Sequence, residues 1–131
     1  MPSEPKILIV DDEERFRTTL GKLLTVHGLE VKTLGSAREA LEVLESNGYD
    51  VILLDVKMPE MNGIEAFFEI KKIDPFIEVI ILTGHASVDI AVEIMRLGGY
   101  DYLLKPCLID DLLDKIETAY ERKQARESVS R

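Results

Sequence analysis

The sequence predicts an α/β fold, a doubly wound sheet of five parallel strands with helices on both faces. Two observations predict it. Short runs rich in Val, Ile and Leu alternate along the chain with longer stretches that are apolar at helical spacing. Three of the five runs are almost continuously apolar, which is typical of strands covered on both faces. Short strand–helix–strand connections require parallel strands with right-handed crossovers, so we expect five strand–helix units.

The five strands are expected at residues 7–10, 29–34, 51–54, 78–82 and 102–104. The second run, LEVKTL, differs from the others because its apolar and polar residues alternate. Alternation indicates a strand with one exposed side, so this strand is placed at an edge of the sheet.

The first two helices have clear boundaries. The first carries an apolar stripe made of Phe16, Leu20, Leu23 and Leu24. Gly28 is well placed to end it. The second opens with Ser36 and Glu39 at capping-box spacing, in which each residue can satisfy the other's free amide. Asn47-Gly48 ends that helix.

The remaining three helices follow the same logic. The third should turn Ile64, Phe67, Phe68 and Ile70 inward and end by Asp74, because Pro75 disfavours helix in the residue before it. The fourth should begin near Ser87, with Asp89 in its first turn, and stop at Gly98-Gly99. The fifth is defined by Ile109, Leu112, Leu113, Ile116 and Tyr120 and could run on to Arg126.

Length and charge limit the possible functions. A chain of 131 residues has the size of one domain, for which we expect a tail at 1–5, a folded unit at 6–120, and a helix end or linker at 121–131. The 16 basic and 25 acidic residues give a net charge of −9, which disfavours binding to nucleic acid. One cysteine, Cys107, cannot form an internal disulfide. Neither a signal peptide nor an apolar run of the ~20 residues that a membrane span needs is found, so we expect a cytoplasmic location.

Polar residues gather where the strands end. In a doubly wound sheet, ligands bind at the carboxyl ends of the strands. There the chain places Asp11 and Asp12 after the first strand, Asp55 after the third, Thr83 after the fourth and Lys105 after the fifth. Three neighbouring carboxylates repel one another unless a cation lies among them, and their hard oxygens favour Mg²⁺. With a hydroxyl and an ammonium beside them, they form a cradle for a phosphoryl group.

These residues resemble the receiver domain of two-component response regulators. The resemblance rests on Asp11-Asp12, on Asp55 followed by Met58-Pro59 and Gly63, on Thr83, and on Lys105-Pro106, and it covers about residues 6–120. It implies the flavodoxin-like strand order 2-1-3-4-5. Residues 85–93 and 99–102 look most like receivers of the nitrogen-regulatory, enhancer-binding activator class.

The resemblance also implies a role for each site residue. Asp55 would accept the phosphoryl group from a sensor histidine kinase or a small phosphodonor. Mg²⁺ would be held by Asp12 directly, by Asp11 through water, by Asp55 and by the Lys57 carbonyl.

The resemblance extends to the residues that respond to phosphorylation. Lys105, preceding a cis proline, would pair with the phosphoryl oxygens. Thr83 would move toward the phosphoryl group and Tyr102 would turn inward, changing a face on the fourth and fifth helices where receivers dimerise or contact an output domain. Lys57 and His85 would tune the lifetime of the phosphorylated form.

Other interpretations of the same residues stay open. Asp11 and Asp12 could cap the first helix, and Tyr102 could simply pack. A Mg²⁺-dependent aspartyl phosphatase shares this architecture, but such enzymes usually carry an Asp-x-Asp pair, and Lys57 stands two residues after Asp55. A degenerate receiver that binds partners without phosphorylation is disfavoured because no expected site residue is missing. We therefore expect a signalling domain rather than an enzyme.

Overall fold

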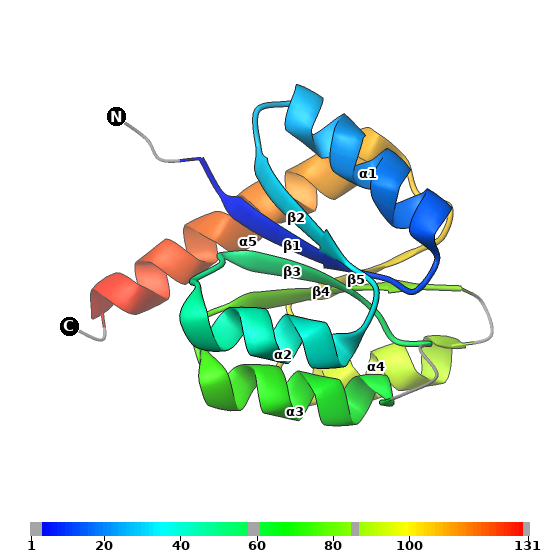
Figure 1. Cartoon of the computed structure of the whole chain (residues 1–131). Coiled ribbons are helices and arrows are strands. Elements are labelled where there is room, and N and C mark those ends of the chain that lie inside the picture. Colours follow the sequence, from blue (N-terminus) through cyan, green and yellow to red (C-terminus); the bar gives the residue numbers. More distant parts are fainter. Residues whose placement is uncertain (1–3, 58–60, 85–86, 130–131) are drawn as a thin grey trace.

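The computed structural model describes residues 4–57, 61–84 and 87–129 and contains five strands and five helices in strict alternation (Figure 1). The strands are β1 (Lys6–Val10), β2 (Glu30–Leu34), β3 (Val51–Asp55), β4 (Glu78–Thr83) and β5 (Asp101–Leu104). The helices are α1 (Glu14–Val26), α2 (Ala37–Ser46), α3 (Gly63–Ile73), α4 (Val88–Arg96) and α5 (Ile109–Val129). Every predicted element is present, and its bounds lie close to the predicted ones except at the end of α5.

All five strands are parallel and lie in the order β2-β1-β3-β4-β5, which confirms the predicted topology. The alternating strand β2 lies at the edge, as predicted. Asp55 and Thr83, expected just after their strands, are instead the last residues of β3 and β4. The strands pair in register, so their carboxyl ends meet at one edge of the sheet.

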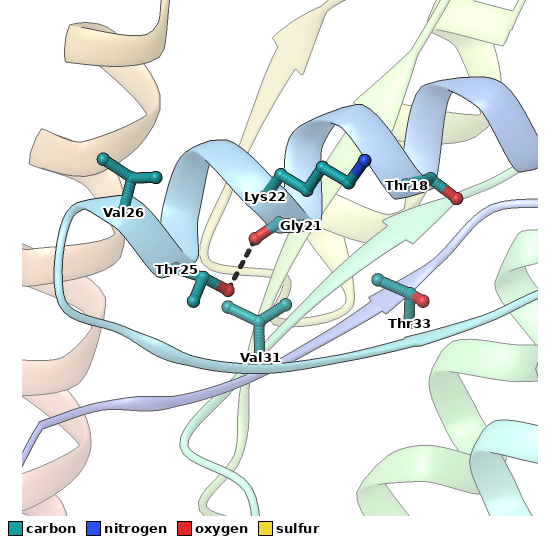
Figure 2. A pocket seen from close by; sticks show the side chains of 7 residues that line it. All are labelled: Thr18, Gly21, Lys22, Thr25, Val26, Val31 and Thr33. Carbon is teal, nitrogen blue, oxygen red and sulfur yellow. Dashed lines mark hydrogen bonds between the residues drawn. The ribbon is translucent and has the colours of Figure 1, made fainter.

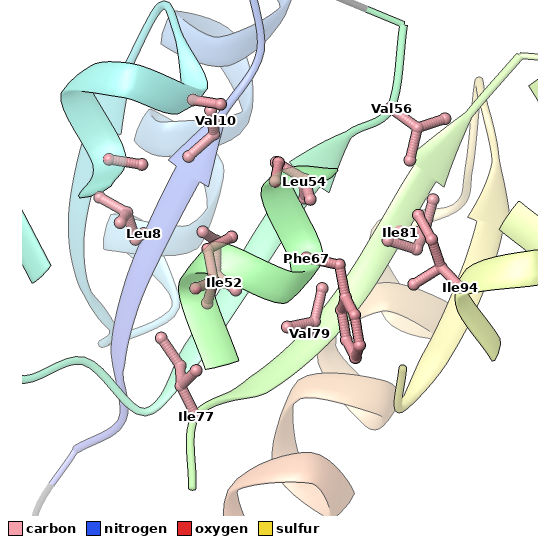
Figure 3. Packing of buried hydrophobic residues seen from close by; sticks show 14 of the residues in the cluster. Leu8, Val10, Ile52, Leu54, Val56, Phe67, Ile77, Val79, Ile81 and Ile94 are labelled. Atoms are coloured by element: carbon pink, nitrogen blue, oxygen red, sulfur yellow. The ribbon is translucent and has the colours of Figure 1, made fainter. Parts of the chain in front are cut away.

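The core consists of two layers, one on each face of the sheet. Helices α2, α3 and α4 cover one face, and α1 and α5 cover the other (Figure 1). In Figure 3, Leu8, Ile52 and Val79 lie on the first face, with Phe67 of α3 and Ile94 of α4 packed over the sheet. The intervening residues of the same strands, such as Ile9 and Leu53, pack on the second face. Burial on both faces explains why the central strands are almost continuously apolar.

Local signals set most helix ends. Gly28 follows α1 with φ +89°, a left-handed conformation that favours glycine. At the start of α2 the Glu39 amide donates to the Ser36 hydroxyl at 3.2 Å, as predicted. The return bond differs, because the Ser36 hydroxyl donates to the Glu39 carboxylate at 3.1 Å and the carboxylate does not cap the Ser36 amide. Asp74 ends α3, as predicted.

Two predicted core positions are wrong. Phe68 was expected to point inward, but 48% of its surface is exposed, and Leu23 is similarly exposed. Helical spacing places both at the border of an apolar stripe. The buried width of α1 and α3 is narrower than that stripe, because Leu20, Leu24, Phe67 and Ile70 already fill the contact with the sheet.

Helix α5 continues to Val129, beyond the expected limit at Arg126. Its last turns are tied to the amino edge of the sheet. Arg126 and Arg122 lie 3.1 and 3.4 Å from the buried carboxylate of Glu78, and Lys123 lies 2.9 Å from Asp50. Within the described ranges, no helix has the length and apolar character that crossing a membrane would require.

Candidate functional site

The carboxyl edge of the sheet brings the three predicted acids together. Carboxylate oxygens of Asp11, Asp12 and Asp55 lie within 4.8 Å of one another. Asp11 follows β1 and is fully buried, Asp55 ends the central strand β3, and Asp12 is exposed at the mouth of the site. Neighbouring central strands therefore produce an acidic cluster that is open to solvent on one side.

Asp11 is held at every polar atom. Its Oδ1 accepts the Glu13 amide at 2.9 Å, and its Oδ2 accepts the ammonium of Lys105 at 2.5 Å. Its own amide donates to the Leu34 carbonyl at 3.1 Å, and its carbonyl accepts Arg17 Nη1 at 3.1 Å. The bond to the Glu13 amide closes a turn ahead of α1, but Glu13 is the N-cap residue and no side chain caps the helix, so the interpretation of Asp11 and Asp12 as helix caps is wrong.

Lys105 supplies the cation of the site. Its amide donates to the Thr83 carbonyl at 2.8 Å, and the Lys105–Pro106 bond is cis, as the resemblance implied. The ammonium lies 3.7 Å from Asp55 Oδ2 and 4.3 Å from the centre of the Phe16 ring. Burial lowers the pKa of Lys105, but the hydrogen bond to Asp11 and the charge of Asp55 outweigh it, so this pKa is raised.

Asp55 is a carboxylate with a strongly perturbed affinity for protons. Only 6% of its surface is exposed, and burial raises its pKa to about 6. The Lys57 amide, which donates to Oδ1 at 3.1 Å, opposes this shift, whereas the charge of Asp11 adds to it. Asp55 is therefore ionised above about pH 6 but retains high basicity for a carboxylate.

The other predicted residues are placed as follows. Thr83 is fully buried, and its hydroxyl donates to the Gly84 carbonyl at 3.0 Å. Tyr102 lies on the edge strand β5 with 38% of its surface exposed. Lys57 is exposed. His85, Met58 and Pro59 lie outside the described residues.

Two residues of α1 belong to the site although the sequence did not assign them to it. Phe16 was assigned to the apolar stripe, yet its ring lies beneath the Lys105 ammonium. No sequence pattern points to Arg17, yet its side chain donates to the backbone carbonyl of Asp11. Arg17 bonds a residue six positions before it, and Phe16 contacts Lys105 near the other end of the chain, so helical spacing contains no signal for either contact.

The donor set fits Mg²⁺. Three hard carboxylate oxygens can approach one point, and the exposed position of Asp12 leaves room for the waters that this ion retains. The ion would be held by Asp11, Asp12 and Asp55, with the Lys57 carbonyl as the further expected ligand.

A second concave region does not share this chemistry. It lies between α1 and the edge strand β2, where Val31 and Thr33 face the helix (Figure 2). The Thr25 hydroxyl is used within α1, where it donates to the Gly21 carbonyl at 2.7 Å. Lys22 is the one charged residue among the seven that line this hollow, so it offers no counterpart to the acidic cluster.

A doubly wound parallel sheet that gathers three acids, a threonine and a lysine at its carboxyl edge has the arrangement expected of a phosphoryl-accepting signalling domain. Comparison with known proteins then identifies the family. Residues 7–117 match the model of the response regulator receiver domain, and the chain belongs to that family. It is the receiver domain of a two-component response regulator.

Similar proteins agree with this identification. The chain is 42% identical over 113 residues to the transcriptional regulatory protein ZraR of Escherichia coli and 39% identical over 119 residues to the DNA-binding transcriptional regulator NtrC of Klebsiella pneumoniae. These matches cover 86% and 88% of this chain but 26% and 25% of the relatives, so the chain spans about a quarter of their length. The predicted nearness to the nitrogen-regulatory activator class is confirmed.

A solved structure matches over almost its whole length. The response regulator receiver domain protein from Clostridium thermocellum superposes with a TM-score of 0.88 at 41% identity, covering 92% of this chain and 98% of that one.

Proposed function

We propose that Asp55 is the phosphoacceptor of this receiver. The observation that carries the proposal is its position. Asp55 lies within 4.8 Å of both other acids and 3.7 Å from the Lys105 ammonium, at the end of the central strand. Its Oδ1 is held by the Lys57 amide, whereas no donor among the described residues bonds Oδ2. Oδ2 faces the Lys105 ammonium at 3.7 Å without a hydrogen bond and is the oxygen positioned to attack.

The reaction transfers one phosphoryl group. An oxygen of the ionised Asp55 attacks phosphorus, the P–N bond of a kinase phosphohistidine breaks, and the bonding electrons leave with the imidazole. With a small phosphodonor such as acetyl phosphate, a P–O bond breaks instead and acetate leaves. Mg²⁺ bound among the acids supplies positive charge that offsets the repulsion between the carboxylates and the incoming phosphoryl oxygens.

Lys105 and Thr83 stabilise the product in this proposal. The Lys105 ammonium, already 3.7 Å from Asp55, is within reach of a phosphoryl oxygen on that residue. The Thr83 hydroxyl donates to the carbonyl of Gly84, the next residue. It can exchange this hydrogen bond for one to the phosphoryl group. Because Tyr102 is only partly buried, it can follow that movement, which would alter the face formed by α4, β5 and α5.

The expected partners are a sensor histidine kinase, an output domain or protein, and a second copy bound through the α4 and α5 face. The relatives named as transcriptional regulators support an output that acts on transcription. A cytoplasmic location accords with such a role. We further propose that the domain is no enzyme toward other substrates, and that it catalyses only its own phosphorylation and dephosphorylation. The lysine at position 57, where an aspartyl phosphatase would carry its second acid, supports this distinction.

The test is the intact mass of the chain after incubation with Mg²⁺ and acetyl phosphate. We expect the wild type to gain one phosphoryl group, and we expect Asp55→Asn, or the wild type with a chelator, to gain none. Asp110→Asn, which removes an exposed carboxylate from the first turn of α5, is the matched control and should react as the wild type does. Release of phosphate in many turnovers without a mass gain would instead favour the phosphatase.

A further inference from the structure

Arg17, in the first turns of α1, fixes the backbone from which the acidic site projects. Its Nη1 donates to the Asp11 carbonyl at 3.1 Å, and the Asp11 amide donates to the Leu34 carbonyl at the end of the edge strand at 3.1 Å. Both backbone polar groups of Asp11 are therefore bonded outside β1. Only 20% of the Arg17 side chain is exposed. Its ion pair with Glu14, at 3.8 Å, contributes little because the Glu14 side chain is largely exposed.

A glycine leaves the space that this guanidinium occupies. A Cβ at Gly35 would lie 3.4, 3.5 and 3.6 Å from Nη1, Cζ and Nη2 of Arg17. The guanidinium thus lies against the backbone of Gly35, between Leu34 and the cap residue of α2. A methyl group there would be in ordinary contact, but a larger side chain would enter the volume of the guanidinium. The Arg17 guanidinium is therefore held between the Asp11 carbonyl, which accepts its hydrogen bond, and the backbone of Gly35, which has no side chain to displace it.

We propose that Arg17 is a positioning residue of the metal site, which fixes Asp11 and Asp12 in the orientation that binds Mg²⁺. This inference rests on the proposed function. It concerns the affinity of the unphosphorylated site for the ion, and Arg17 touches neither the ion nor the phosphoryl group. Residues that orient metal ligands commonly change metal affinity by about 10- to 100-fold when replaced.

A purely electrostatic role and a positioning role of Arg17 predict opposite changes in Mg²⁺ affinity when the residue is replaced. A guanidinium bonded to the carbonyl of Asp11 adds positive charge beside the acidic cluster, so its removal should tighten Mg²⁺ binding if charge alone mattered. If Arg17 positions the ligands, its removal should weaken binding despite the more negative site. The sign of the change therefore separates the two roles.

The experiment is a Mg²⁺ titration of the unphosphorylated chain, followed by amide chemical shifts in NMR spectra. We expect Arg17→Gln to bind Mg²⁺ about tenfold more weakly than the wild type. Arg15→Gln is the control, because Arg15 is exposed, lies two residues away and changes the net charge equally. It should bind Mg²⁺ as well as the wild type or slightly better.

A charge-neutral pair of variants tests the same contact from the other side. Gly35→Val places a branched side chain in the volume of the guanidinium and should weaken Mg²⁺ binding in the same direction as Arg17→Gln. Gly35→Ala, with its Cβ at contact distance, should stay close to the wild type. The dispersed amide spectrum of each variant shows whether it is folded, and if Arg17→Gln is not, the two Gly35 variants decide.

The outcomes separate the two proposals. Mg²⁺ binding by Arg17→Gln that equals or exceeds that of the wild type overturns the positioning role and leaves the proposed function intact. Equal binding by Gly35→Val and Gly35→Ala does the same. A wild-type chain that shows no Mg²⁺-dependent shifts overturns the proposed function, and the positioning role with it.

Discussion

The Lys105 ammonium donates a hydrogen bond of 2.5 Å to Oδ2 of Asp11, a carboxylate without exposed surface. A buried carboxylate needs a compensating charge or several hydrogen bonds, and here the residue that follows β5 supplies the charge to the residue that follows β1. The ammonium therefore compensates the charge of a carboxylate that also belongs to the acidic cluster. Lys105 and Mg²⁺ should consequently stabilise the same group.

Replacement of Lys105 by methionine tests this relationship. Without metal, we expect Lys105→Met to lose roughly 2 kcal/mol of unfolding free energy near neutral pH, because the Asp11 charge is left buried and unpaired. Added Mg²⁺ should recover part of the loss, since it supplies positive charge to the same carboxylates. Urea denaturation with chelator and with Mg²⁺ measures both effects. Lys22→Met, at an exposed position of α1, should change little in either condition, and an equal loss there would contradict the explanation.

The pKa of Asp55 predicts a pH dependence of stability in the metal-free chain. Its pKa is raised to about 6 in the folded state, against ~3.9 for an unperturbed aspartate. The folded state therefore holds the proton more tightly, and its stabilisation by protonated Asp55 is complete below about pH 4 and lost as the pH rises through about 6. Asp55→Asn lacks this loss. We expect its advantage in stability to be small at about pH 4, to grow to about pH 6.5 and then to level off.

Urea denaturation of both chains in chelator at several pH values measures this difference. Mg²⁺ should reverse the order at high pH, because the ion binds the ionised Asp55 and not the amide. A difference that is independent of pH would show that packing, and not ionisation, separates the two chains.

Gly63 explains one part of the family motif by sterics. A Cβ at this first residue of α3 would lie 2.7 Å from both Cβ and Cγ1 of Val56 and 3.1 Å from its Cα. The loop after Asp55 therefore passes too close to α3 for a side chain. We expect Gly63→Ala to destabilise the chain by roughly 1–3 kcal/mol despite the higher helix propensity of alanine. Gly48→Ala is the control, because nothing lies within 4 Å of a Cβ there, and thermal or urea denaturation of the two variants is the measurement. Equal stability of the two variants would mean that the loop yields at little cost.

The fold could be predicted from the sequence because its signals are local. Continuous apolar runs define β1, β3 and β4, and the alternation of the second run placed β2 at the edge. The three acids could also be predicted to meet, because parallel strands in register must share one carboxyl edge. The strands follow from periodicity, whereas the strand order that makes β1 and β3 neighbours was implied by the resemblance to receiver domains.

The contacts that tune the site could not be predicted in the same way. The stripe position of Phe16 indicates that it is buried, but its place under Lys105 depends on the packing of α1 against a loop 89 positions further along the chain. Phe68 illustrates the opposite error, since helical spacing cannot tell a buried position from one at the edge of a stripe. The last turns of α5 are held by Glu78 and Asp50, which lie far from the helix in the sequence. The sequence of the helix alone therefore does not predict where it ends.

The last turns of α5 should contribute to stability through Glu78. This carboxylate is fully buried, its Oε2 is bonded by Arg126 at 3.1 Å and lies 3.4 Å from Arg122 Nε, and its Oε1 has no partner among the described residues. Removing both arginines would take away the two ion-pair partners within 4 Å of this buried carboxylate, so we expect Arg122→Met with Arg126→Met to cost roughly 3 kcal/mol in urea denaturation. Arg96→Met, at an exposed ion pair of α4, should cost far less.

Glu78→Gln, added to the double variant, separates charge from packing. If the cost comes from the uncompensated carboxylate, the neutral amide should recover most of it, because an amide is far less costly to bury than a charge. The guanidinium groups of Arg122 and Arg126 also lie over the rings of Tyr100 and Phe76, at 5.4 and 5.6 Å from the ring centres. Failure of Glu78→Gln to recover stability would assign the anchoring of α5 to these aromatic contacts. Recovery would assign it to the buried charge, and residues 121–129 would then belong to the folded unit because one acid at the start of β4 requires them.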